Sequence, residues 1–388
     1  MRHHNSVLHG LLKHIPWSMF DDLVDEHGAD CGVRRLSTKS QLVALLYGQL
    51  AGAASLREIE TAMSSHSARL YHLGASPVSR STLADANRLR PHAVFSGLLS
   101  AMMGLAGRGC RRSMADAVRL IDSTGLKLAG LQAQWARFSS QACGAKAHIV
   151  YDPDADRPVH LDVTPARVND ITPAKAMPIE PGATYVFDLG YYDYGWWADL
   201  DQAGCRFVTR LKRNTVLTLV QDTPVPHRDG GSAVLYDRIG CLPPRLKGSR
   251  AHPYPSALRE IGVVLDDGKT TLRVVTNDLD APAQEIADLY KRRWAIELFF
   301  RWVKQTLKIR HFLGRSENAV RIQIAVALIA YILVRLAKDA VKIVDSTLAF
   351  ARLIRANLMH RRGLDQLLKP PPNTQRDPRQ LQLDWGSA

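Results

Sequence analysis

The segment from Tyr290 to Phe312, YKRRWAIELFFRWVKQTLKIRHF, constrains the fold more than any other part of the sequence. It contains no Pro or Gly and is rich in apolar residues, so it predicts one continuous helix. At about 100° per residue, its polar positions share a stripe roughly 80° wide. These positions are Tyr290, Arg293, Glu297, Arg301, Lys304 and Lys308. The rest of the circumference, including Trp294, Leu298 and Phe299, is apolar and predicts a largely buried helix.

Glu297 is the single acidic residue of this segment, and it has two interpretations. In the first, Arg293, Glu297 and Arg301 form a ladder of ion pairs one turn apart, each worth about 0.2–0.5 kcal/mol. In the second, the polar stripe faces a functional site and Glu297 belongs to it. The helix alone favours the ladder.

Two other carboxylates change this balance. Asp122 interrupts the apolar strand sequence VRLIDSTGL, and Asp188 follows the strand sequence TYVF. An Asp in such a strand is unfavourable unless it is paired or bound to a cation. If the two strands are neighbours, their carboxylates can meet at one edge of a sheet, and Glu297 can complete the group.

Three carboxylates without matching Cys or His ligands are typical of a site for a hard cation such as Mg²⁺ or Mn²⁺. The Arg and Lys residues beside Glu297 suit phosphate groups. Carboxylates that hold two such ions are the arrangement that activates water and stabilises the leaving oxygen in phosphodiester displacement.

The first part of the chain, residues 1–112, predicts a helical domain. Its second half contains the helix SLREIETAM, a Gly/Pro break, and the Ser/Arg-rich helix SRSTLADANRLR. This order resembles a helix-turn-helix, so we expect Arg80, Ser81, Thr82 and Arg88 to contact DNA. The alternative is that this last helix is an ordinary surface helix.

From about Ala117 onward, strands alternate with helices, which predicts an α/β core. We expect the core in two parts, 113–213 and 271–345, separated by a β-rich insertion at 214–270. Helices and a Pro-rich tail follow at 346–388. Asp152, Asp154 and Asp156 resemble a calcium loop, but Val163 stands at the twelfth position, where such a loop has Glu, so they predict a turn.

The charge balance points to a polyanionic partner. The chain has 51 Lys and Arg against 37 Asp and Glu, for a net charge of +14. Nucleic acid is the first candidate and an acidic membrane surface the second. The apolar stretch from Ile322 to Val334 is shorter than the roughly 20 residues needed to span a bilayer, so we expect a buried helix and no membrane partner. Five scattered Cys without a CxxC pair suit a reducing cytoplasm.

Four of these residues, Tyr290, Arg293, Glu297 and Lys304, match the pattern Y-x2-R-x3-E-x6-K. That pattern resembles the signature of bacterial DDE transposases of the insertion-sequence-four (IS-four) family. IDSTG around Asp122 and DLGYYD from Asp188 resemble the two aspartate motifs of that family. FVTRLKRNT, GRSENAVRIQIAVALIA and the N-terminal SLREIE are also similar, so the resemblance covers nearly the whole chain except the tail.

The resemblance implies an RNase H-like catalytic core, interrupted by the β-rich insertion and preceded by the helical DNA-binding domain. It implies that Asp122, Asp188 and Glu297 hold two Mg²⁺ ions, for which Mn²⁺ can substitute. Tyr290, Arg293 and Lys304 would contact the DNA backbone, and we expect their basic neighbours Arg301 and Lys308 to contribute to phosphate binding.

The resemblance further implies cut-and-paste movement of double-stranded DNA in the cytoplasm, by a homodimer that pairs the two element ends. Family relatives form a DNA hairpin and hold a flipped base with an aromatic side chain. The insertion contains no Trp, so Tyr236 and Tyr254 are the candidates for that role. Two alternatives remain: an RNase H-like nuclease without strand transfer, and a DNA-binding regulator with an inactive core.

Overall fold

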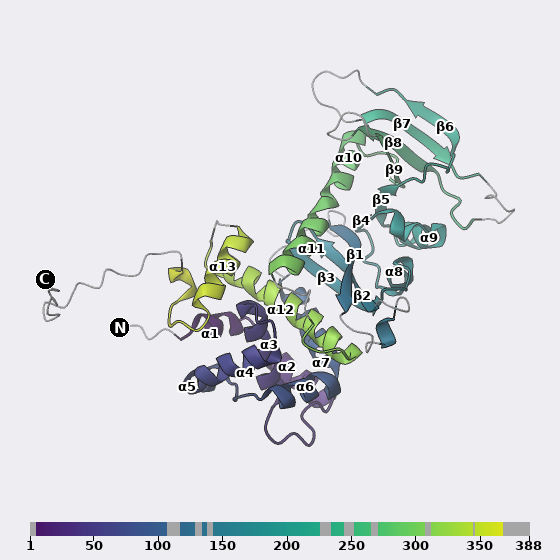
Figure 1. Ribbon diagram of the computed structural model, residues 1–388. Helices are drawn as coiled ribbons and strands as arrows, with labels where there is room; N and C mark the ends of the chain where they lie inside the picture. Colours follow the sequence, from purple (N-terminus) through teal and green to yellow (C-terminus); the bar gives the residue numbers. More distant parts are fainter. Residues whose placement is uncertain are drawn as a thin grey trace, which may run out of the picture.

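The computed structural model describes residues 5–106, 117–128, 134–137, 143–225, 234–243, 252–264, 271–306, 312–343 and 346–367 (Figure 1). It combines a group of N-terminal helices with a large mixed sheet flanked by further helices. Lys308, the Pro-rich tail and the expected boundary near residue 112 lie outside the described residues.

The N-terminal part is helical, as the sequence predicts, and its helices begin at polar caps. The Ser37 side chain accepts a hydrogen bond from the Ser40 backbone, and Ser55 accepts one from the Glu58 backbone. These contacts satisfy backbone N–H groups that have no partner within the helix. The helices are α1 (Val7–Leu12), α2 (Trp17–Glu26), α3 (Thr38–Ala51), α4 (Leu56–Ser65), α5 (Ser67–Leu70), α6 (Arg80–Leu89) and α7 (His92–Ala106).

The described strands form one nine-stranded sheet in the order β3-β2-β1-β4-β5-β9-β8-β7-β6. The strands are β1 (Val118–Leu128), β2 (Cys143–Asp152), β3 (Arg157–Pro165), β4 (Thr184–Val186), β5 (Arg206–Arg210), β6 (Thr218–Thr223), β7 (Val234–Cys241), β8 (Leu258–Val264) and β9 (Thr271–Thr276). β1, β4 and β5 are parallel, and every other neighbouring pair is antiparallel. The strands expected in the insertion therefore extend the sheet of the core.

Alternating side chains give the sheet two apolar faces. Leu120 and Val186 belong to one buried cluster, which also contains residues of α10 (Ala283–Arg292), α11 (Trp294–Thr306) and α12 (Glu317–Ala340). Ile121 and Tyr185 belong to the other, with residues of α8 (Ile171–Ala176) and α9 (Tyr194–Gln202). Successive residues of a strand point to opposite faces, so these helices cover the two faces of one sheet (Figure 1).

α12 lies between the N-terminal helices and the sheet and contacts α7, α3, β3 and α11 (Figure 1). With 24 residues it is longer than the apolar stretch predicted from the sequence, and its length and composition would allow it to cross a membrane. However, 83% of its most apolar window is buried inside the protein. It is therefore a core helix, as expected. A further helix, α13 (Thr347–Asn357), packs against α12 and α3.

The acidic turn between β2 and β3 fastens the sheet to these helices. The Asp152 carboxylate accepts hydrogen bonds from the backbone amides of Asp154 and Ala155. The segment is therefore a turn, as predicted. Arg292 of α10 forms an ion pair with Asp154 at 2.6 Å, and Arg335 of α12 forms one with Asp156 at 2.8 Å.

The continuous helix predicted from Tyr290 to Phe312 is wrong, because α10 ends at Arg292 and α11 begins at Trp294. At the junction, the Arg293 amide donates to the Tyr290 carbonyl and the Ile296 amide donates to the Arg293 carbonyl. This spacing of three residues tightens the turn locally.

The apolar sector of α11 is only partly buried. Ile296, Phe299 and Phe300 are buried, whereas Trp294 is 51% exposed and Leu298 is 47% exposed. The prediction that this sector is buried is therefore wrong for Trp294 and Leu298.

Candidate catalytic site

Strand register brings two of the predicted carboxylates together. In the parallel pair of β1 and β4, Leu120 lies opposite Val186. Asp122 and Asp188 stand two residues further along their chains, so they continue this register and point to the same face as Leu120 and Val186. Asp188 lies at the start of a short 3₁₀ turn, Leu189–Tyr191, where its carboxylate accepts a hydrogen bond from the Gly190 amide at 2.8 Å.

α11 brings the third carboxylate to this face. Glu297 lies in the first turn of α11, which packs against β1. The Arg293 guanidinium joins the two elements, at 2.6 Å from Glu297 and 3.7 Å from Asp122. One part of the expected ion-pair ladder is therefore present, but it also reaches the carboxylate on the sheet.

These carboxylates repel one another, which is visible in the titration of Asp122. Burial, the largest cause, and the charges of Asp188 and Glu297 together raise the pKa of Asp122 to about 6, against the opposing effects of the Ser123 amide and Arg293. Removing a carboxylate from water disfavours its charged form, and nearby negative charges add to that effect. An additional cation would stabilise this arrangement.

The residues fit a hard cation by their chemistry but do not enclose one in this structure. The three side chains offer only oxygen donors, and those of Asp122 and Glu297 are partly exposed, at 18% and 31%. Within the part of the chain that is described, no group of three or more Asp, Glu, His or Cys side chains is close enough to hold an ion. The Arg293 guanidinium instead bridges Asp122 and Glu297.

An open pocket of about 430 Å³ lies in front of Asp122 and Glu297. Its lining also includes Arg301 and Lys304, so two of the predicted DNA-contacting residues face the same space as two of the carboxylates. Lys308, the next basic residue of the stripe, lies outside the described residues.

Tyr290 lies on the other side of Arg293. Its ring centre is 5.9 Å from the Arg293 guanidinium. Burial raises the pKa of the Tyr290 hydroxyl, the nearby charges of Arg293 and Arg210 lower it, and Asp188 raises it again. Arg210, at the end of β5, is thus a basic neighbour of the site that the sequence analysis did not single out, although it lies within the motif FVTRLKRNT.

The aromatic candidates of the insertion are both engaged in packing. Tyr254 is 1% exposed. The Tyr236 ring covers Gly262 on the neighbouring strand, and its hydroxyl donates to Glu260 at 2.9 Å. Trp294, by contrast, exposes half of its surface one turn before Glu297. This exposure was not predictable from residue types, because an apolar residue on an apolar helix is normally buried.

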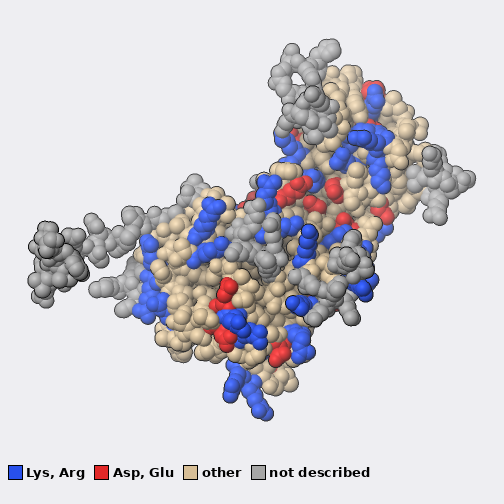
Figure 2. All heavy atoms as spheres, in the orientation of Figure 1, with Lys and Arg blue, Asp and Glu red and all other residues tan. Residues whose placement is uncertain are grey.

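The N-terminal candidates lie on α6, in the helical part of the molecule (Figure 1). Arg80, Ser81 and Thr82 are exposed in its first turn. Arg88 is also exposed and forms a 3.4 Å ion pair with Asp85. They are accessible to a partner but are not brought together with the carboxylates. Figure 2 shows Lys and Arg side chains spread over both the helical part and the sheet part of this face.

Comparisons with known families place residues 114–333 in a model described as a transposase DDE domain. Residues 3–76 match a domain of unknown function. The first match includes Asp122, Asp188 and Glu297. The candidates Arg80, Ser81, Thr82 and Arg88 lie between the two matched stretches.

Two curated relatives span most of the chain. The first, "Putative transposase y4zB" of Sinorhizobium fredii, is 43% identical over 307 residues, which cover 78% of this chain and 85% of the relative. The second, "Probable transposase for insertion sequence element IS5377" of Geobacillus stearothermophilus, is 28% identical over 266 residues, 68% of each. Among solved structures, a piggyBac transposase synaptic complex with hairpin DNA aligns with a TM-score of 0.47 and 11% identity, over 95% of this chain and 83% of that one.

Proposed function

The chain belongs to the bacterial DDE transposases, and we propose that Asp122, Asp188 and Glu297 are the carboxylates that carry its chemistry. The observation that supports this most is their arrangement. Asp122 and Asp188 lie side by side on one face of the sheet, and α11 packs against that face with Glu297 in its first turn.

The strands β1–β5 with their helices form the RNase H-like core of this proposal. The mixed strand order supports this core, because Asp122 lies on β1 and Asp188 follows the neighbouring parallel strand β4. The division proposed from the sequence is kept: the N-terminal domain at 1–112, core parts at 113–213 and 271–345, the insertion at 214–270 and the C-terminal segment at 346–388.

Two Mg²⁺ ions, or Mn²⁺ in their place, are the proposed cofactors of the three carboxylates. When bound, such ions supply charge stabilisation to the in-line displacement at phosphorus. Arg293 has a role of its own here: it keeps Asp122 and Glu297 together while no metal ion is bound. Once a cation neutralises the carboxylates, the Arg293 guanidinium would be available to a DNA phosphate.

Double-stranded DNA is the proposed partner. Arg301 and Lys304 face the pocket beside the carboxylates, and Tyr290 and Arg210 lie near Asp188, so a phosphate backbone placed there would meet several cationic groups. Lys308 continues the same stripe in the sequence. We further propose that Arg80, Ser81 and Thr82 contact the element ends, and that a homodimer pairs these ends in the cytoplasm.

We propose Trp294 as the aromatic side chain that meets a DNA base. It is exposed, it adjoins Arg293, and it is one turn from Glu297, whereas Tyr236 and Tyr254 are both held by packing. A flat apolar surface without a protein partner is what stacking on a base requires.

The test uses the full-length protein, DNA carrying the element ends, and Mg²⁺. We expect the wild-type protein to cut at the ends and to join them to target DNA, and Glu297→Gln to do neither while still binding the ends. Glu285→Gln, an exposed carboxylate on α10, is the matched control and should behave as wild type.

The same assay separates the alternatives. Cutting without joined products would identify a nuclease without strand transfer, and end binding without cutting would identify an inactive regulator. Cleavage that persists in EDTA, or in Glu297→Gln, would contradict the proposed catalytic role.

A further inference from the structure

Behind the three carboxylates, on the opposite face of the sheet, lies a second polar group that the proposed chemistry does not use. Asp170 is its centre, in the loop between β3 and α8. Its Oδ1 atom accepts hydrogen bonds from the Ser123 hydroxyl at 2.9 Å and from the Lys146 ammonium at 2.9 Å. Residues of α8, the helix that Asp170 precedes, belong to the apolar cluster of this opposite face.

Strand register explains why these residues meet. Ser123 lies opposite His148, and Gly125 lies opposite Lys146 in the antiparallel pair of β1 and β2. Ser123 follows Asp122, so its side chain points to the other face of the sheet. The Asp170 contacts are therefore one residue away from a catalytic carboxylate but separated from it by the sheet backbone.

Asp170 is connected to both aspartates of the site. The Ser123 amide donates to the Asp122 carboxylate at 2.7 Å, while the Ser123 hydroxyl donates to Asp170. At Gly190, a Cβ atom would lie 3.0 Å from the Asp188 carboxylate and 3.4 Å from that of Asp170. The strand that carries Asp122 thus contacts Asp170 through Ser123, and the turn that carries Asp188 passes close beside Asp170 at Gly190.

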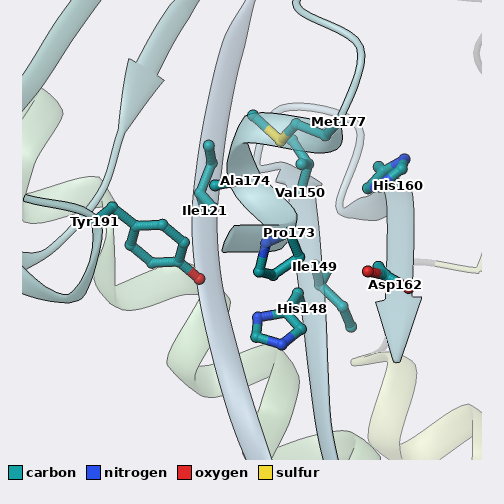
Figure 3. Close-up of a pocket in the computed structure, with 10 residues that line it drawn as sticks. All are labelled: Ile121, His148, Ile149, Val150, His160, Asp162, Pro173, Ala174, Met177 and Tyr191. Carbon is teal, nitrogen blue, oxygen red and sulfur yellow. The ribbon is translucent and has the colours of Figure 1, made fainter. Parts of the chain in front are cut away.

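The other polar groups on this face contact Asp170 less closely. His148 Nδ1 lies 3.6 Å from Asp170 Oδ1, further than Ser123 and Lys146 do. A cavity of about 10 Å³ lies between β1, β2 and α8, and the Tyr191 hydroxyl and the His148 ring are directed into it (Figure 3). The Tyr191 hydroxyl and His148 Nδ1 are buried without a hydrogen-bond partner among the described residues. Asp170 therefore links β1 and β2 through polar contacts, and it lies beside the turn at Gly190.

We propose that Asp170 is a positioning residue that holds Asp122 and Asp188 side by side for metal binding. This inference rests on the proposed function of those carboxylates. Groups that orient metal ligands contribute about 10- to 100-fold to metal affinity or activity. The role assigned to Asp170 is exerted through Ser123 and Gly190, without contact with the metal or the DNA.

The experiment measures Mn²⁺ affinity of the full-length protein by calorimetry without DNA, together with end binding, melting temperature and the Mn²⁺ dependence of end cleavage. The variants are Asp170→Ala, Ser123→Ala and their combination. Asp199→Asn, an exposed carboxylate on α9 over the same face, controls for the loss of one negative charge.

We expect Asp170→Ala and Ser123→Ala each to weaken Mn²⁺ binding about 10-fold or more and to raise the Mn²⁺ concentration needed for half-maximal cleavage. End binding should be unchanged. Ser123→Ala retains every carboxylate, so its effect isolates the contact from the charge. The combined variant should lose little more than either single one, because both remove the same contact.

Wild-type Mn²⁺ affinity in both Asp170→Ala and Ser123→Ala would overturn the inference, as would a loss matched by Asp199→Asn. A lower melting temperature with unchanged Mn²⁺ affinity would assign Asp170 a structural role only and would overturn it too. Failure of the proposed function gives a different result. In that case Asp122→Asn would bind Mn²⁺ as the wild-type protein does, whatever the Asp170 variants do.

Discussion

The carboxylates of the proposed site and the buried carboxylates of the β6–β9 half of the sheet are paired differently. In the β6–β9 half, each buried carboxylate has its own arginine: Asp237 pairs with Arg259 through two hydrogen bonds of 2.8 and 2.7 Å, and Glu260 pairs with Arg273 at 2.6 and 2.9 Å. In the β1–β5 half, Asp122 and Glu297 share the single guanidinium of Arg293.

The titration of the two kinds of carboxylate follows this difference. Burial alone would raise the pKa of Glu260, but hydrogen bonds from Arg273 and Tyr236 lower it below its ordinary value. The pKa of Asp122, by contrast, is raised to about 6. The Glu260 carboxylate is matched with a cation of the protein, whereas Asp122 lacks a full partner, which agrees with the metal site proposed for it.

The largest expected effect is on cleavage. Asp122→Asn retains the size of the side chain and removes the charge, so we expect end cleavage to fall on the order of 10³-fold or more. Because the substitution also removes repulsion from Asp188 and Glu297, the free energy of unfolding should stay the same or increase. Cleavage rates and urea unfolding on the same samples check both parts. A large loss of stability in Asp122→Asn would contradict the distinction between the site carboxylates and the paired carboxylates of the β6–β9 half.

The second prediction concerns the β6–β9 half. Asp237→Asn leaves the Arg259 guanidinium, which is 8% exposed, without its charge partner. Breaking such a buried pair on one side costs about 3–5 kcal/mol, so urea unfolding should show a loss of that size. Asp222→Asn is the matched control, since its ion pair with Arg238 is about half exposed and should contribute at most about 1 kcal/mol. If both substitutions lowered the free energy of unfolding equally, burial would not explain how much each ion pair contributes to stability.

These pairings also show how far the sequence could predict the molecule. The sequence predicted that Asp122 and Asp188 could meet if their strands were neighbours, and β1 and β4 are neighbours in the sheet. The Y-R-E-K spacing pointed to Glu297 as the third carboxylate. The contacts of Arg259 and Asp170 were not predictable in the same way. Asp237 and Arg259 meet through the register of β7 and β8, and Asp170 meets Ser123 and Lys146 through β1 and β2. No local pattern encodes such registers.

Two features of α11 were also missed for physical reasons. The tightened turn at Arg293 depends on hydrogen bonds over three rather than four residues, and residue types alone do not distinguish these in a good helix sequence. The exposure of Trp294 and Leu298 depends on which other elements cover the helix. The spacing of apolar residues within the helix does not predict this.

The third prediction uses pH. The folded-state pKa of Asp122 lies above its ordinary value of 3.8, so without metal the folded protein loses stability as pH rises from about 4 to about 6. For Glu260 the sign is opposite: its contribution is present above 4.5 and is lost as pH falls through its lowered pKa. In EDTA, we expect Asp122→Asn to gain about 1–3 kcal/mol over the wild type across that window. Urea unfolding at several pH values measures this difference. A difference independent of pH would contradict the raised pKa.

The smallest expected effect tests whether the Arg293–Glu297 pair stabilises the fold. The two residues are one helical turn apart, and the Glu297 side chain is 31% exposed, so water screens their attraction. A double-mutant cycle with Arg293→Ala and Glu297→Gln should therefore give a coupling energy of about 0.3–1 kcal/mol. The same cycle for Asp237 and Arg259 should give several times more, because both side chains are excluded from water. If the two cycles gave equal coupling energies, Glu297 would be explained as a structural ion pair and its presence beside Asp122 would need no catalytic role. A small coupling with complete loss of cleavage in Glu297→Gln would instead show that this carboxylate is retained for chemistry, since it contributes so little to the fold.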